Sequence, residues 1–223
     1  MEDIKLLAHE RYPECFGENK YSFNDHHLGG TNVVGDPATY HHPNVWGYLF
    51  NTHGIASMVD IGSGFGFAMK FVKDHFPGIR VEGVEGSKKV CDLHLCPKSV
   101  VQHDYTTGPV TIDDFDLGWS TEFVEHVEEQ YVPNFVETFK CCRYVAFTYA
   151  YKGQGGHHHV NENTEEYWIG VMESNGFEYL ADETCKLREL AELDKQEVLA
   201  QYGTNFIFHF QERGLFFKNK NRK

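Results

Sequence analysis

Two short stretches of this sequence place metal-ligating side chains close together. The first has the pattern E-x-x-E-H over residues 122–126, and the second is the run of three histidines at 157–159. On a helix, positions i, i+3 and i+4 share one face, so Glu122, Glu125 and His126 are predicted to point the same way. Two carboxylates and an imidazole are poor core residues and good ligands for a divalent cation.

Other roles stay open for both stretches. The acids and the imidazole of the first stretch could line a pocket that holds no metal, or could be hydrogen-bonded for a structural reason. The histidine run could supply a metal ligand or a general base, because histidine titrates near neutral pH and binds metals readily. It could also be a solvated polar loop. The rest of the chain has to decide between these roles.

The elements that position these residues alternate between strands and helices from about residue 55 onward. Apolar runs predict strands at 55–61, 79–84, 99–102, 115–119, 144–149, 177–180 and 206–217. Amphipathic spacing predicts helices at 67–76, 87–95, 121–140, 164–175 and 185–202. This alternation indicates an α/β, Rossmann-like domain with a seven-stranded, mainly parallel sheet and helices on both faces.

Residues 1–54 differ from the rest and are rich in Gly, Pro, His and Asn. We predict an N-terminal lid or cap over the carboxyl edge of the sheet, followed by one domain at 55–223; a packed extension without ligand contact is the alternative. Several side chains of this segment could reach an acceptor or could lie in a surface loop: His26, His27, Tyr40, His41 and His42.

Composition limits the partners and the location of the chain. The net charge of −13 argues against non-specific binding to a nucleic-acid backbone, which needs clustered Lys and Arg. No run of eighteen apolar residues predicts a membrane span, and the acidic N-terminus does not resemble a signal peptide, so we expect an intracellular, cytoplasmic protein. The six cysteines form no C-x-x-C pair and are predicted to be reduced thiols.

A glycine turn follows the first predicted strand, in the stretch Val59-Asp60-Ile61-Gly62-Ser63-Gly64-Phe65-Gly66. Glycines let the backbone approach a ligand closely, and the following helix N-terminus favours an anionic group. In a dinucleotide-binding site the third glycine lies one residue later. The glycine spacing of this chain therefore counts against a nicotinamide dehydrogenase. Asp60 suits a cofactor that carries an ammonium group.

This stretch resembles motif I of the class I S-adenosylmethionine (SAM)-dependent methyltransferases, and the resemblance runs from about residue 55 to the C-terminus. It implies that SAM binds along the carboxyl edge of the sheet. The resemblance implies that one acidic residue accepts hydrogen bonds from the ribose hydroxyls and another accepts from the adenine amino group. It also implies that a residue of the fourth strand lies beside the methionine portion. The predicted cofactor-binding residues are Asp60, Gly62, Ser63, Gly64, Glu85, Asp104, Tyr105 and Ser120.

The E-x-x-E-H pattern is similar to that of two metal-dependent groups in this class, the ubiquinone-biosynthesis O-methyltransferases and the small-RNA 3′-terminal 2′-O-methyltransferases. The resemblance implies an Mg²⁺ or Mn²⁺ ion on Glu122, Glu125 and His126. A further histidine after the fifth strand completes such a site, and spacing to the next helix favours His159. His126 and His158 are the predicted catalytic residues, with His158 as general base.

The predicted activity is transfer of the SAM methyl group to a hydroxyl of a vicinal diol or catechol. The expected acceptor is a sugar, a glycan or a small metabolite, because the acidic charge favours a partner that is not polyanionic. A ribose at an RNA 3′ end presents the same diol and is the first alternative. A non-catalytic, SAM-binding subunit is the second. The signatures of amino-methylating DNA enzymes and cytosine-C5 enzymes are missing.

Overall fold

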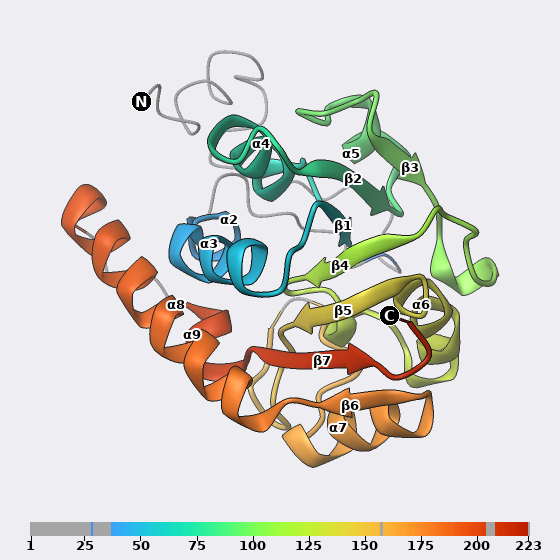
Figure 1. Ribbon diagram of the computed structural model, residues 1–223. Helices are drawn as coiled ribbons and strands as arrows, with labels where there is room; N and C mark the ends of the chain where they lie inside the picture. The colour runs from blue at the N-terminus through green and yellow to red at the C-terminus, as the bar shows by residue number, and fades with distance from the viewer. Residues whose placement is uncertain (1–27, 29–36, 157, 204–207, 223) are drawn as a thin grey trace.

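The computed structural model describes residues 28, 37–156, 158–203 and 208–222. Seven strands form one sheet in the order β3-β2-β1-β4-β5-β7-β6 (Figure 1). β7 runs antiparallel to both of its neighbours, whereas the other pairings are parallel. The predicted seven-stranded, mainly parallel α/β sheet is therefore confirmed. The strands are β1 (Ser57–Ile61), β2 (Arg80–Glu85), β3 (Val100–Gln102), β4 (Phe115–Ser120), β5 (Cys142–Phe147), β6 (Phe177–Tyr179) and β7 (Leu215–Asn219).

Helices cover both faces of this sheet, because each face buries its own apolar cluster. One cluster joins the sheet to α3, α4, α8 and α9, and the other joins it to α6 and α7. The helices are α2 (Pro37–Tyr40), α3 (Pro43–Thr52), α4 (Phe67–His75), α5 (Lys88–Asp92), α6 (Val132–Phe139), α7 (Glu165–Ser174), α8 (Ala181–Tyr202) and α9 (His209–Arg213). Within the described ranges, none of these helices has the length and apolar character needed to span a bilayer.

Two predicted elements differ from those in the structure. The single helix expected at 121–140 is a loop, two short 3-10 helices at Val124–His126 and Glu129–Tyr131, and then α6. Glu122 has a left-handed backbone (φ 52°), which breaks a helix at its start, and a proline occupies the first turn of α6. The strand expected at 206–217 is α9 followed by β7, so only its last part pairs in the sheet.

The described part of the predicted lid contains α2 and α3. α2 lies at the carboxyl edge of the sheet: the hydroxyl of Thr121, just after β4, donates to the Thr39 carbonyl (3.4 Å), and Tyr40 stacks on Phe67. α3 instead packs into the core on one face of the sheet. Residues 1–27 and 29–36, with His26 and His27, lie outside the described residues. The lid role of this segment stays a prediction.

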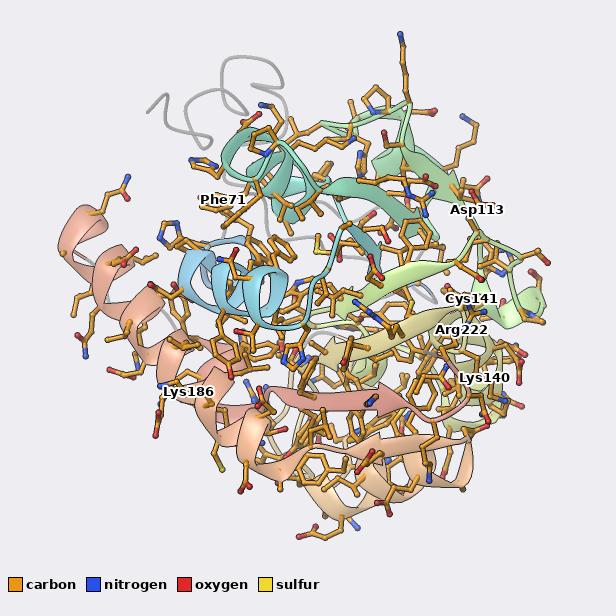
Figure 2. The ribbon with its side chains drawn as sticks, in the orientation of Figure 1. Phe71, Asp113, Lys140, Cys141, Lys186 and Arg222 are labelled. Carbon is orange, nitrogen blue, oxygen red and sulfur yellow. The ribbon has the colours of Figure 1, made fainter. Side chains whose placement is uncertain are left out.

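The C-terminal segment folds back along the opposite, amino edge of the sheet. Figure 2 shows Arg222 beside Lys140 and Cys141, and the Arg222 Nε–H donates to the Lys140 carbonyl (2.6 Å). Arg222 also pairs with Asp114 at 2.6 Å. Arg222 is therefore held against an acid at the edge remote from the glycine turn.

Candidate active site

The glycine turn between β1 and α4 is fixed to the neighbouring strand. The N–H groups of Gly62 and Ser63 both donate to the Val84 carbonyl, at 2.9 and 3.1 Å. Gly62 is left-handed (φ 76°), and a Cβ there would lie 2.5 Å from the ring of Phe123. Both the backbone conformation and the close ring therefore require glycine at position 62.

Two buried carboxylates lie beneath this turn. Glu85 accepts from the Gly64 N–H (2.9 Å) with one oxygen and from the Ser87 N–H (2.8 Å) with the other. Burial, and then the charge of Glu85, raise the pKa of Asp60 to about 7. An ammonium group placed here would restore the ionised form of Asp60, so this pair fits the predicted cofactor end.

The other predicted cofactor residues divide into two kinds. Asp104 lies at the edge of the sheet, where its carboxylate caps the next turn by accepting from the Thr106 N–H (2.8 Å). Tyr105 and Ser120 are buried, and their hydroxyls donate to the Thr138 hydroxyl and the Ile61 carbonyl at 3.0 and 2.8 Å. The side chains of Tyr105 and Ser120 are therefore used inside the protein, and a cofactor there would meet their main chain.

Three of the four predicted metal ligands come together. Glu125, His126 and His159 each offer one ligand atom, and these atoms all lie within 4.8 Å of one another. The side chain of Glu125 is 0% exposed, and neither of its oxygens has a hydrogen-bond partner among the described residues. Burial, and then the charge of Glu122, raise the pKa of Glu125 well above its ordinary value. A buried carboxylate in this state fits a bound cation, which would supply the missing partner.

Both imidazoles of this cluster are oriented through their Nδ1 atoms. The Nδ1–H of His126 donates to the His158 carbonyl (3.2 Å), and the Nδ1 of His159 faces the Glu162 carboxylate at 3.4 Å. The His126 hydrogen bond places the proton of that ring on Nδ1 and the lone pair on Nε2, which is the usual arrangement of metal-bound histidines. The residues present therefore fit Mg²⁺ or Mn²⁺, and the two nitrogens favour Mn²⁺.

Glu122 reaches the site by a different route from the one predicted. It does not share a helical face with Glu125 and His126, because its left-handed backbone places it in the loop after β4. The Thr148 hydroxyl binds it, accepting from the Glu122 N–H (2.9 Å) and lying 3.1 Å from its carboxylate. Glu122 lies outside the set of three mutually close ligands, although its charge acts on Glu125.

The sequence interpretation missed His209, Arg213 and Glu162. His209 Nδ1 lies 3.4 Å from the Glu122 carboxylate and contacts the Arg213 guanidinium, which also binds Gln154. Burial, and then the charge of Arg213, lower the pKa of His209 to about 4. His209 was missed because its segment was predicted to be a strand. Glu162 lies three residues after His159, and this i, i+3 spacing is its signal in the sequence.

Backbone strain is concentrated at this site. Among the described residues, Glu122 and His158 are the two non-glycine residues with positive φ, at 52° and 56°. Each such conformation costs free energy and is retained where the surrounding structure demands it, most often at functional sites. Here the strain at His158 aims its carbonyl at His126.

Two of the three described candidates for acceptor contact in the N-terminal segment, Tyr40 and His42, lie in the interior. His42 is fully buried between Trp46 and Trp119, and Tyr40 is buried against Phe67. His41 is partly buried and faces Glu197 at 3.5 Å. His42 is therefore a core residue rather than a surface or acceptor contact.

No family model matches this sequence, and no curated protein matches it either. Among solved structures, the plantazolicin methyltransferase BpumL, in complex with a triazolic desmethylPZN analog and SAH, covers 83% of this chain and 86% of its own, with TM-score 0.56 and 10% identity. A second BpumL structure, with SAH, gives TM-score 0.54, 12% identity and coverage of 82% and 83%. A proposed RNA methyltransferase from Pyrococcus horikoshii gives TM-score 0.50 and 14% identity, and the match covers 78% of this chain and 84% of that one.

The fold is that of the class I methyltransferases. The match extends over most of this chain and of those chains, so the likeness is one of the whole fold.

Proposed function

We propose that this protein is a SAM-dependent O-methyltransferase that uses a divalent cation and methylates one hydroxyl of a vicinal diol or catechol. The observation that carries the proposal is the buried Glu125 carboxylate between His126 and His159. It lies in the same segment as Phe123, whose ring packs on Gly62 of the glycine turn. A cation site beside a methyl-donor site is the arrangement that an alkoxide-forming transfer needs.

This chain would bind the methyl donor mainly through its carboxylates and through the main chain of the glycine turn. Asp60 would accept from the ammonium group, Glu85 from the ribose hydroxyls and Asp104 from the adenine amino group. Gly62 and Gly64 allow the close approach of the methionine portion. Burial and the Glu85 charge raise the pKa of Asp60, and an ammonium group beside it would offset both effects by stabilising the ionised form.

On the acceptor side, the two imidazoles and Glu125 would hold the cation, with Glu122 beside them. When bound, the cation lowers the pKa of a hydroxyl and fixes the neighbouring oxygen. The chain itself keeps Glu125 away from water and presents the Nε2 atom of His126, whose Nδ1–H donates to the main-chain carbonyl of His158, the predicted general base. His159 offers the second imidazole.

The charges at the site favour a neutral acceptor. Glu122 contributes negative charge beside the cluster, and Arg213, the nearby buried cation, already binds Gln154 and His209. A phosphate chain would meet this field and a net charge of −13 unfavourably. We therefore rank a sugar, a glycan or a small catechol above an RNA 3′ end, whose ribose diol remains the second candidate.

The test is methyl transfer from SAM to a panel of diols, catechols and RNA 3′ ends, with and without EDTA. We expect turnover on a neutral diol that EDTA abolishes and Mn²⁺ restores. Glu125→Gln should lose at least about 10²-fold in turnover, together with Mn²⁺ binding measured by paramagnetic resonance, and should keep its affinity for SAH. The matched control is Glu128→Gln, an exposed acid of the same segment.

The outcomes separate the competing functions. Full turnover in excess EDTA would remove the metal from the mechanism. Turnover on RNA ends alone would favour the ribose 2′-O-methyltransferase. SAH binding without turnover on any acceptor would favour a non-catalytic subunit.

A further inference from the structure

His94 lies behind the glycine turn and is not part of the site described above. Its side chain is 1% exposed. The ring packs so closely on Gly66 that a Cβ on that glycine would lie 2.2 Å from the His94 Cε1. On its other side, the His94 Nε2 lies 3.3 Å from the Ser63 hydroxyl. One imidazole therefore contacts two of the residues that shape the turn.

The hydrogen bonds of His94 define its protonation state. Its Nδ1 accepts from the Cys96 N–H at 2.9 Å, so Nδ1 carries the lone pair. In a neutral ring the proton is then on Nε2 and points at the Ser63 oxygen. Burial lowers the pKa of His94 to about 4, in agreement with a neutral ring throughout the physiological range.

The turn is a segment that needs such support. Gly62, Gly64 and Gly66 all have positive φ, and glycine loses more conformational entropy on ordering than any other residue. The segment after α5 binds the turn a second time, because the Leu95 N–H donates to the Phe65 carbonyl at 2.9 Å. The Ser63 side chain points toward His94 and Gly83, and so belongs to this support.

We propose that His94 is a positioning residue for the cofactor: its neutral imidazole holds Ser63 and covers Gly66, so that the glycine turn has its binding shape before the cofactor arrives. The inference rests on the proposed function in one respect, namely that this turn binds SAM or SAH. A preformed site costs less ordering entropy on binding, so its loss weakens affinity.

The experiment measures two quantities for His94→Ala and His94→Gln. One is the affinity for SAH by calorimetry, and the other is hydrogen exchange at the Gly66 amide in the ligand-free protein, since that N–H donates to the Ser63 carbonyl. We expect His94→Ala to bind SAH about tenfold more weakly and to exchange about tenfold faster at Gly66. His94→Gln, whose amide can donate to Ser63, should recover most of both losses.

The control is Met172→Ala, which opens a cavity in the core on the other side of the sheet. It should lower Tm without changing either quantity. If His94→Ala lowers Tm but leaves both the SAH affinity and the exchange at Gly66 unchanged, His94 is only a core residue and the proposal is overturned.

Two further outcomes are also decisive. If His94→Ala does not fold, Ser63→Ala removes the same contact and should weaken SAH binding about threefold; an unchanged affinity would overturn the proposal. If the wild-type protein does not bind SAH, the proposed function fails, whereas exchange at Gly66 still tests whether His94 supports the turn.

Discussion

At the scale of single residues, the neighbouring carboxylates of Asp60 and Glu85 lie in different electrostatic environments. Glu85 accepts two main-chain N–H groups, which stabilise its charge. Asp60 is buried beside that charge, and its pKa rises to about 7. Since the folded pKa exceeds that of the unfolded chain, Asp60 contributes stability below about pH 4 that is lost as the pH rises through 7. A bound ammonium group would reverse this penalty.

This difference predicts a pH-dependent affinity for SAH. Below pH 7 Asp60 must release a proton before it can pair with the ammonium group, so binding at pH 6 should be about tenfold weaker than at pH 8. Calorimetry across this range measures the slope. Asp60→Asn, which cannot ionise, should bind weakly with little slope; a slope equal to that of the wild type would assign the titration to another group.

At the scale of elements, the loop between β5 and α7 arranges the histidines. Glu162 accepts from the N–H groups of Gly153 and Gly155 at 2.8 and 2.7 Å and faces His159. The Val160 and Asn161 N–H groups donate to the Glu125 carbonyl at 2.9 and 3.1 Å. The loop is therefore fastened both to itself and to the segment that carries Glu125 and His126.

His158 tests this arrangement because its carbonyl, rather than its ring, contacts His126. Glycine adopts a positive φ without strain and keeps the carbonyl, so His158→Gly should retain Mn²⁺ affinity within about threefold of the wild type. Titration followed by paramagnetic resonance measures it. Retained Mn²⁺ affinity with lost turnover would support the predicted base role of the imidazole, and a large loss of Mn²⁺ affinity would contradict the main-chain role.

A second pair of elements, α3 and α8, is joined by one acid. Asp194 of α8 is fully buried and accepts from the main-chain N–H groups of Asn44 and Val45, at 2.9 and 3.4 Å, in the first turn of α3. Asp194→Ala leaves these donors without an acceptor and should lower the free energy of unfolding by about 2 kcal/mol. Urea denaturation measures the change, and the exposed Gln196→Ala should cost less than about 0.5 kcal/mol. Equal costs would contradict the capping role.

At the scale of the whole molecule, the alternation of strands and helices was enough to predict the sheet, because apolar runs and glycine stops are local signals. The site was predictable only in part. Glu122 was placed on a helix because its spacing fits one, whereas contacts with Thr148 hold it in a left-handed loop. His209 lies between Phe208 and Phe210, an alternation typical of a strand, yet both rings pack around His42 above the sheet. Long-range packing decided these positions, and sequence spacing does not report it.

The overall charge gives the last prediction, which concerns ionic strength. A net charge of −13 repels a polyanion over a distance that salt shortens, so turnover on an RNA 3′ end should rise as salt increases from about 50 to 300 mM. Turnover on a neutral diol should change by less than about twofold, because no long-range field acts on it. Initial rates of both acceptors at matched Mn²⁺ measure this difference. An RNA rate that falls with added salt would indicate a local basic surface that outweighs the net charge, and would move the acceptor proposal from the neutral diol to the RNA end.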